Sequence, residues 1–321
     1  MEPRDHSRLL VCGRHGATRH CFFYNIIDYL HKGDVLVVNH TKTIPARLLG
    51  NRENGGVVEF LLLRRRDKDT WEALVRPGRK MKPGDRAVFG EGLLRAKVLE
   101  YIPAEGGRLV HFTYEGIFEE LLDRLGTMPL PPYIKEKLED PGRYNTVYAK
   151  IGGSAATPTA GLHFTEELLS RIEEKGVAIV PVLLHVGLGT FRPVKVEDVS
   201  RHAMHSEYYE VNQQAADAIN AARQKGGRII CVGTTSVRTL ETVTGADGVV
   251  KAGAGYTGLF ITPGFHFCAA DAMITNFHLP ESTLLMLVCA FMGKENAFRA
   301  YQEAIRERYR FFSFGDAMLI L

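Results

Sequence analysis

Residues 155–169 read A-A-T-P-T-A-G-L-H-F-T-E-E-L-L and join a run of small residues and one proline to the start of a helix. Thr165 is a suitable N-cap, and Glu166 and Glu167 favour the positive end of the helix dipole. We expect the helix to begin after Thr165 and to end at Gly176, before the next strand. The stretch therefore predicts the turn and helix that connect two strands in an α/β fold.

The same turn has the features of a ligand site. Backbone with small side chains beside a helix N-terminus can approach an anionic or polar ligand closely. His163 is the first candidate for proton transfer here and Glu166 a further one, while Thr159 and Gly161 are candidates for substrate binding. The alternative is a tight structural loop in which the histidine caps a neighbouring carbonyl group.

Helix and strand patterns alternate from residue 144 to the end of the chain. Asn212 caps an amphipathic helix, and a further helix opens at Gly233. Strands are expected at residues 177–185, 228–232, 258–261, 273–277 and 317–321, and helices at residues 213–225, 283–292 and 296–309. This alternation indicates an α/β domain with a largely parallel sheet.

Near the N-terminus, residues 35–39 (V-L-V-V-N) predict a buried strand that ends in a polar turn. Strand ends are common places for ligand-binding side chains. Arg47 follows this turn and can clamp a carboxylate or phosphate with two hydrogen bonds. The alternative is a surface arginine that only pairs with a glutamate.

Residues 46–142 have a different pattern. Short apolar or alternating runs at residues 57–63, 71–75, 87–89, 93–101 and 108–114 are separated by turn signals, and a short helix is expected around residues 117–125. Strands at this spacing favour an antiparallel sheet closed as a small barrel. We expect residues 46–142 to form an inserted β-barrel domain with its connector. It interrupts a discontinuous α/β catalytic domain of residues 1–45 and 143–321.

The charge of the chain is unevenly distributed. Residues 64–97 hold eleven Lys and Arg against five Asp and Glu, so this window carries +6 while the remainder carries −3. A local basic surface suits a phosphate backbone. The candidates for RNA contact are Arg64, Arg65, Arg66, Arg79 and Lys80. The alternative is a solvated strand face.

The composition, 45% hydrophobic and 24% charged, is typical of globular proteins. The longest apolar run, residues 284–292, is too short to span a bilayer, and no signal peptide precedes the first charged residues. Five scattered cysteines without C-x-x-C spacing indicate reduced thiols. We expect a cytoplasmic protein that does not enter a membrane.

Further polar clusters follow the predicted strands: H-V-G-L-G-T-F-R at residues 185–192, G-T-T-S-V-R at 233–238 and T-N-F-H at 275–278. Exposed glycine backbone can hydrogen-bond a ligand, and hydroxyls at a helix start form an anion nest. His278 joins the candidates for proton transfer. The substrate-binding candidates in these clusters are His185, Gly187, Gly189, Thr190, Arg192, Thr234, Thr235, Arg238, Thr275 and Asn276.

His202, His205 and Glu207 lie within six residues, but a histidine pair without a clear third ligand does not predict a metal site. No metal is expected, and His205 stays a further candidate for proton transfer. The chain contains none of the motifs G-x-G-x-x-G, G-x-x-x-x-G-K-[ST] or G-x-S-x-G. Their absence argues against a standard dinucleotide fold, a P-loop and a hydrolase elbow. The residues alone thus indicate an α/β enzyme with an anion-accepting site and an inserted basic barrel.

Six segments in this order resemble the S-adenosylmethionine:tRNA ribosyltransferase-isomerase family of queuosine biosynthesis. They are Y-N-T-V-Y-A-K at residues 144–150, P-T-A-G-L-H-F-T-E-E at 158–167, L-H-V-G-L-G-T-F-R-P at 184–193, G-T-T-S-V-R-T-L-E at 233–241, I-T-N-F-H-L-P at 274–280 and Y-R-F-F-S-F-G-D-A-M-L-I at 309–320. Asn39-His40-Thr41-Lys42 departs from the family's N-D-T-R or N-N-T-R, so Lys42 keeps a charge without the guanidinium fork. The resemblance also implies that the chain lacks about twenty N-terminal residues, which puts one edge of the first domain in doubt.

The resemblance implies the reaction. The ribosyl group of S-adenosylmethionine is transferred to 7-aminomethyl-7-deazaguanine in the tRNA anticodon and isomerised, which forms epoxyqueuosine and releases adenine and methionine. S-adenosylmethionine is then a substrate, and no metal or redox cofactor is needed. On this basis Arg192 or Arg238 binds the methionine carboxylate, and Thr234 and Thr235 bind a ribose or carboxylate. We expect a monomer; an inactive tRNA-binding relative and an RNA methyltransferase are the alternatives.

Overall fold

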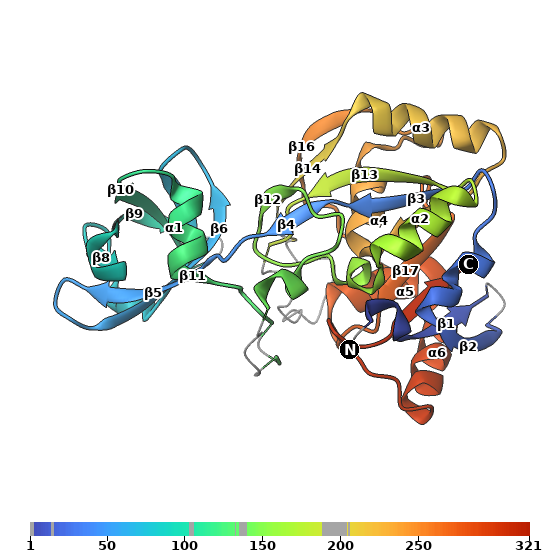
Figure 1. Cartoon of the computed structure of the whole chain (residues 1–321), viewed down its shortest axis with the longest axis horizontal. Helices are drawn as coiled ribbons and strands as arrows, with labels where there is room; N and C mark the ends of the chain where they lie inside the picture. Colours follow the sequence, from blue (N-terminus) through green and yellow to red (C-terminus); the bar gives the residue numbers. More distant parts are fainter. Residues whose placement is uncertain are drawn as a thin grey trace. The chain divides into compact units, whose positions relative to one another are not determined.

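The structure, a computed structural model, describes residues 3–13, 16–102, 106–131, 133–134, 140–187, 204 and 206–321. The chain forms two compact units (Figure 1). The α/β unit comprises residues 1–41, 145–151 and 158–321, and the barrel unit comprises residues 42–144 and 152–157. The boundaries expected from the sequence, at residues 46 and 142, stay a prediction.

The α/β unit is built on a nine-stranded sheet of the described residues, in the order β16-β14-β13-β3-β15-β17-β18-β1-β2. Its strands are β1 (Arg8–Cys12), β2 (Thr18–Phe22), β3 (Val35–Asn39), β13 (Ala178–Leu184), β14 (Glu207–Val211), β15 (Ile229–Val232), β16 (Gly253–Thr257), β17 (Ala272–Asn276) and β18 (Ala317–Ile320).

The sheet is mixed, so the expectation of a largely parallel sheet is only partly met. Four of the eight strand pairings among the described residues are parallel: β13–β3, β3–β15, β15–β17 and β18–β1. The other four are antiparallel: β14 and β16 extend one end of the sheet, β2 forms its other edge, and β17 pairs with β18 in the opposite direction. The strand expected at residues 258–261 is wrong, since β16 lies one segment earlier in the chain.

Both faces of the central strands are buried, as their continuous apolar runs require. Alternate residues belong to two separate cores. Val35 and Val37 of β3 pack with the helices within residues 213–306, whereas Leu36 and Val38 pack with the helix at residues 166–174 and the 3₁₀ segments at residues 23–29 and 159–163. Figure 1 shows helices on both faces of this sheet. The alternation follows from the two-residue period of a strand.

Local capping explains where several helices begin. Thr165 Oγ1 accepts the backbone N–H of Leu168, and Asn212 Oδ1 accepts that of Ala215, as the sequence predicts. The helices of the unit are α2 (Glu166–Glu174), α3 (Gln213–Gln224), α4 (Gly233–Val243), α5 (Thr283–Met292) and α6 (Lys294–Arg306), with 3₁₀ segments η1 (Arg4–His6), η2 (Phe23–Tyr29) and η6 (Thr159–His163).

The barrel unit confirms an inserted antiparallel barrel. Six strands close through the pairing of β5 with β8, in the order β5-β6-β7-β10-β9-β8, and β11 adds to β5. Trp71, Phe89 and Phe112 are among the side chains buried in this unit. Its elements are β5 (Arg47–Arg52), β6 (Val57–Arg65), β7 (Thr70–Arg76), η3 (Gly78–Lys80), β8 (Arg86–Phe89), η4 (Gly90–Gly92), β9 (Leu94–Ile102), β10 (Gly107–Tyr114), α1 (Phe118–Leu125), β11 (Gly126–Thr127) and η5 (Pro141–Tyr144).

One further ladder joins β4 (Thr41–Thr43) to β12 (Ile151–Ser154), at the segments where the chain passes between the two units. Within the described ranges, no helix has both the length and the apolar character to cross a bilayer.

Candidate active site

Four neighbouring strands of the α/β unit run parallel and end at the same edge of the sheet. Polar residues stand at or just after these ends: Asn39 after β3, His185 after β13, Gly233 after β15 and Asn276 at the end of β17. The chain leaves β3 towards β13 through α2 and leaves β15 towards β17 through α4, and these helices pack on opposite faces. Ligands of α/β sheets bind outside such a reversal of strand order, so this edge is the candidate active site.

His163 lies at this edge, at the end of η6, and is almost completely buried. Its Nδ1 lies 2.6 Å from Ser7 Oγ, and its Nε2 lies 3.0 Å from Nδ2 of Asn276. Thr159 Oγ1 donates to Asn276 Oδ1 at 3.0 Å, and the ring of Phe23 stacks on the imidazole with centroids 5.0 Å apart. The structure thus brings together three sequence candidates, His163, Thr159 and Asn276.

These contacts determine the tautomer of His163. An amide nitrogen only donates, so Nε2 accepts from Asn276 and Nδ1 carries the proton that is donated to Ser7. Burial lowers the pKa of His163 to about 4, while the charge of Asp316 acts in the opposite direction. The imidazole is therefore neutral at pH 7, and both of its nitrogens are already engaged.

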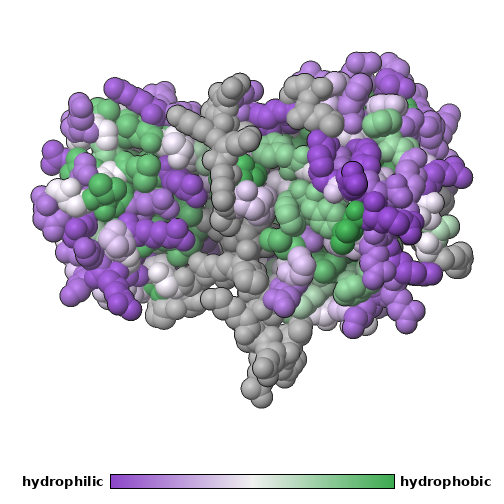
Figure 2. Space-filling view, turned by 90° about the horizontal axis from the view of Figure 1, so that it is seen from below, coloured by the Kyte–Doolittle hydropathy of each residue, from purple (hydrophilic) through white to green (hydrophobic). Residues whose placement is uncertain are grey.

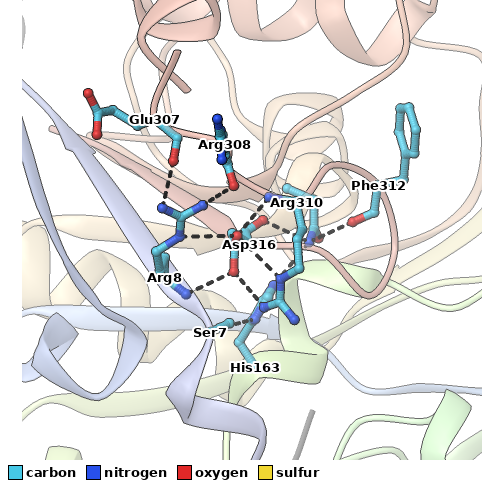
Figure 3. A network of polar contacts seen from close by, with 9 residues as sticks. Ser7, Arg8, His163, Glu307, Arg308, Arg310, Phe312 and Asp316 are labelled. Atoms are coloured by element: carbon cyan, nitrogen blue, oxygen red, sulfur yellow. Dashed lines mark hydrogen bonds and ion pairs between the residues drawn. The ribbon is translucent and has the colours of Figure 1, made fainter. Parts of the chain in front are cut away.

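An ion-pair network of Arg8, Arg310 and Asp316 lies next to this histidine (Figure 3). The fully buried carboxylate of Asp316 accepts the backbone N–H groups of Arg8 at 2.9 Å and Arg310 at 2.8 Å, and the Arg310 guanidinium at 2.6 Å. Burial opposes ionisation of Asp316, but the hydrogen bonds from Arg310 and Arg8 prevail and lower its pKa. Carbonyl groups of Phe312 and Asp316 accept from Asn276 Nδ2, so the network also orients the amide that holds His163.

His278 follows the end of β17 and is half-buried. Its Nε2 lies 2.7 Å from Thr275 Oγ1, and its backbone N–H donates to the Tyr301 hydroxyl at 2.9 Å. Burial lowers its pKa to about 4. No contact of its Nδ1 with another described residue is present.

The start of α4 carries two buried polar atoms without partners among the described residues, Thr235 Oγ1 and Arg238 Nη2. The other groups of Arg238 are used: Nη1 pairs with the buried carboxylate of Glu207, and Nε donates to the Leu259 carbonyl at 3.0 Å. Glu207 also accepts the backbone N–H of Gly187 at 2.7 Å. This arrangement can bind one anionic group at the helix N-terminus, where backbone N–H groups are free of intrahelical partners.

His185, on the same edge, contacts Thr41 Oγ1 through Nδ1 at 2.8 Å. Burial lowers its pKa to about 4, and the nearby charge of His40 acts in the same direction. Asn39 has a structural role, because its amide donates to the carbonyl of Leu184 and accepts that residue's N–H. It therefore joins the ends of β3 and β13.

Several sequence candidates lie elsewhere. Arg47 is part of β5 in the barrel unit, where its Nε lies 3.9 Å from a carboxylate oxygen of Glu59. Glu166 is exposed in the first turn of α2. The remaining candidates, His205, Gly189, Thr190 and Arg192, and also His202, lie outside the described residues. No three His, Cys, Asp or Glu side chains in the described part of the chain form a group that could hold a metal ion.

The basic residues of the barrel fall into two kinds. Arg65 pairs with Glu119 and lies over the ring of Trp71, and Arg66 pairs with Glu72, so both have intramolecular partners. Arg64 is half-buried in β6 and also has an intramolecular contact. The second kind is Arg79 and Lys80 of η3, which are exposed and form no ion pair with a described residue. The second kind is the better placed for contact with a phosphate backbone.

Sequence reasoning missed Ser7, Glu207 as a ligand of Arg238, and the pair Arg310–Asp316. Arg310 and Asp316 lie in the segment Y-R-F-F-S-F-G-D-A-M-L-I, which carried the resemblance but suggested no role. No local signal marks Ser7, because its contact with His163 joins residues 156 positions apart.

Fold and site together define an α/β protein with an inserted β-barrel and a histidine-rich polar site at the carboxyl ends of its parallel strands. The chain matches the family described as queuosine biosynthesis protein over residues 1–320. It is 60% identical to the S-adenosylmethionine:tRNA ribosyltransferase-isomerase of Symbiobacterium thermophilum and 61% identical to that of Moorella thermoacetica, in both cases over all of this chain and 94% of the relative. The chain therefore belongs to the queuosine biosynthesis family.

A solved structure is also similar. The crystal structure of S-adenosylmethionine tRNA ribosyltransferase from Thermotoga maritima matches with a TM-score of 0.55 and 40% sequence identity. The match covers all of this chain and 94% of that one.

Proposed function

We propose that this chain transfers the ribosyl group of S-adenosylmethionine to 7-aminomethyl-7-deazaguanine in a tRNA anticodon and isomerises it. The products are epoxyqueuosine-tRNA, adenine and methionine. The observation that carries the proposal is the identity of about 60% with S-adenosylmethionine:tRNA ribosyltransferase-isomerases over the whole chain. The neutral histidines at the sheet edge suit the proton transfers that the reaction needs.

The chemistry begins with a proton removed from the ribose carbon next to the sulfonium, which the positive sulfur acidifies. Loss of adenine follows, and the aminomethyl nitrogen of the tRNA base then attacks the sugar. Expulsion of methionine completes the rearrangement. The protein must supply a neutral base and a group that holds the methionine carboxylate.

His278 is the better base of the two first candidates. Thr275 can accept the Nε2 proton, which leaves the lone pair of Nδ1 for the substrate. His163 has no such nitrogen, because Asn276 and Ser7 occupy both. We assign His278 the first proton transfer and His163 a positioning role.

The start of α4 suits the methionine carboxylate. Thr235 Oγ1 and Arg238 Nη2 are buried polar atoms that lack partners among the described residues, and they lie one turn apart on the helix. Glu207 holds the rest of the guanidinium in place. A carboxylate bound here accepts a charge-assisted hydrogen bond from Arg238. The dipole of α4 also stabilises its negative charge.

The barrel unit is the proposed site of tRNA contact, through the exposed cations of η3. A barrel that recognises folded RNA uses phosphate contacts and an accessible loop. The tRNA substrate places the reaction in the cytoplasm, and we propose that one chain is sufficient. Residues 46–142 would form the RNA-binding domain, and residues 1–45 and 143–321 the catalytic one.

The test is product analysis after the protein is mixed with S-adenosylmethionine and tRNA that carries the aminomethyl-deazaguanine. Adenine and methionine in equal amounts, with a matching mass gain on the tRNA, are expected. Release of S-adenosylhomocysteine would make the protein an RNA methyltransferase, and tRNA binding without any product would make it an inactive relative.

The role of His278 is tested in the same assay. In His278→Ala, adenine release should fall by about 10²- to 10⁴-fold, the usual contribution of a positioned general base. His266→Ala is the control, because this histidine is exposed in the segment between β16 and β17 and is not among the candidate site residues. Adenine release at the wild-type rate in His278→Ala would remove the proposed base, and release at the wild-type rate in His163→Ala would remove the positioning role of His163.

A further inference from the structure

A cavity of about 580 Å³ in the α/β unit is not used by the groups described so far. Its apolar walls come from the loop after β16 and from helices α5 and α6, through Phe260, Leu285, Met286 and Phe298. Two charged residues, Glu281 and Lys294, are also part of the lining. A cavity of this volume, with mostly apolar walls and a few polar groups, is typical of a small-molecule or nucleoside subsite.

The cavity adjoins the candidate active site along the chain. Glu281 is three residues beyond His278, so their Cα atoms are at most about 11 Å apart. On the other wall, Phe260 directly follows Leu259, whose carbonyl accepts Arg238 Nε at 3.0 Å. Residues of the cavity wall are therefore chain neighbours of the proposed base and of a residue that contacts Arg238.

The walls fit a planar base with a guanine-like edge. An exposed aromatic ring, Phe298, is 49% accessible and can stack on a base. The exposed carboxylate of Glu281 has no contact with another described residue and can accept two parallel N–H groups, the pattern of N1–H and N2–H₂ of guanine. Lys294 can donate to the O6 acceptor beside them.

We propose that this cavity, between the loop after β16 and helices α5 and α6, receives the 7-aminomethyl-7-deazaguanine base of the tRNA, flipped out of its anticodon loop. The inference rests on the proposed function for the identity of the base. A flipped base stays attached to its strand, so its pocket must be open on one side, and this cavity is open to solvent where Phe298, Glu281 and Lys294 are exposed. Figure 2 shows apolar surface exposed among hydrophilic side chains on this unit.

The adenosine of S-adenosylmethionine is the competing occupant. Adenine offers the carboxylate only one amino group, whereas the guanine edge offers two donors in line. Glu281 is therefore matched to the tRNA base and not to the adenine.

The experiment measures binding without turnover. The probes are an anticodon stem-loop that carries 7-aminomethyl-7-deazaguanine, the same stem-loop with adenine at that position, and S-adenosylmethionine alone. In Phe298→Ala, binding of the modified stem-loop should weaken about 5- to 150-fold, the value of one base–aromatic stack. In Glu281→Gln it should weaken about tenfold. Phe298→Tyr keeps the ring and should bind like the wild type.

The matched controls are on α6, the helix of Phe298, but outside the cavity lining. Ile305→Ala removes an exposed apolar side chain, and Glu295→Gln removes an exposed carboxylate. Both should retain wild-type binding of all three probes, and the two cavity variants should retain binding of the adenine stem-loop and of S-adenosylmethionine.

Weaker binding of S-adenosylmethionine with unchanged selectivity for the modified base would overturn the proposal, because the cavity would then hold the adenosine. Unchanged binding of every probe would overturn it as well, as would a wild-type protein with no preference for the modified stem-loop. The proposed function fails separately, when no adenine or methionine is released. An inactive protein that still selects the base through these residues would retain the cavity assignment.

Discussion

Replacement of Asp316 by asparagine tests whether the buried ion-pair network holds the candidate active site together. The carboxylate receives the backbone N–H groups of Arg8 and Arg310 and the Arg310 guanidinium, and its side chain is 1% exposed. An asparagine has one acceptor oxygen in place of two. Its amide nitrogen would face a backbone N–H or a guanidinium. Because an amide NH₂ group cannot accept a hydrogen bond, at least one of these donors would lose its partner.

The magnitude follows from these contacts. Loss of one partner of a buried ion pair costs about 3–5 kcal/mol, and one hydrogen bond to a charged group is worth about 1.5–3 kcal/mol. The side chains of Arg8 and Arg310 are 35% and 43% exposed, so water can replace part of the interaction that they lose. We therefore expect Asp316→Asn to lower the free energy of unfolding by about 2–3 kcal/mol.

The assay is urea unfolding at pH 7, followed by circular dichroism at 222 nm, because five of the helices described here belong to the α/β unit. The chain has one tryptophan, Trp71, in the barrel unit, so its fluorescence reports on the other unit in the same sample. Glu307→Gln is the control, since its pair with Arg306 is exposed and worth about 0–1 kcal/mol.

The contribution of Asp316 to the free energy of unfolding depends on pH in a definite direction. The pKa of Asp316 is lower in the folded protein than in the unfolded chain, so its contribution is present above about pH 4 and is lost as the pH falls through the folded pKa. The difference between wild type and Asp316→Asn should be constant from pH 8 to about pH 5 and decrease below about pH 4. A cost below 1 kcal/mol at pH 7, or a cost equal to that of Glu307→Gln, would refute the role given to the network.

Three further predictions concern packing, titration and RNA contact. Gly161→Ala should destabilise the protein by about 1–3 kcal/mol, because its Cβ would lie 2.0 Å from the Tyr148 hydroxyl, whereas Gly253→Ala has open space and should be neutral in the same urea assay. Burial lowers the pKa of three site histidines from 6.5 to about 4, so the free energy of unfolding should fall as the pH decreases from about 6.5 towards 4; a flat profile would contradict this. Charge reversal of Arg79 and Lys80 to glutamate should weaken tRNA binding and reduce its salt dependence without changing the affinity for S-adenosylmethionine, and equal tRNA affinity would count against the barrel as the RNA-binding unit.

Much of the local structure could be predicted because its causes are local. Thr165 and Asn212 cap their helices through hydrogen bonds that span three residues, and the β6 to β10 runs alternate within single strands. The sequence predicted a strand at residues 258–261 that is wrong, and it missed the strands β1, β2 and β14. These strands depend on pairing with neighbouring strands and not on a local pattern.

The sequence by itself determined that an α/β domain is interrupted by a barrel, that the family is one of queuosine biosynthesis, and which polar segments follow the strands. These properties depend on hydrophobic periodicity, turn residues and the order of motifs. All of these can be recognised from residues that are neighbours in the sequence. Only the tertiary structure decided the mixed order of the sheet, the proton on Nδ1 of His163, and the pairing of Arg238 with Glu207. The contacts of His163 and the pair Arg238–Glu207 join residues more than 30 positions apart, because burial and long-range pairing, and not neighbouring residues, select the partner of a polar group.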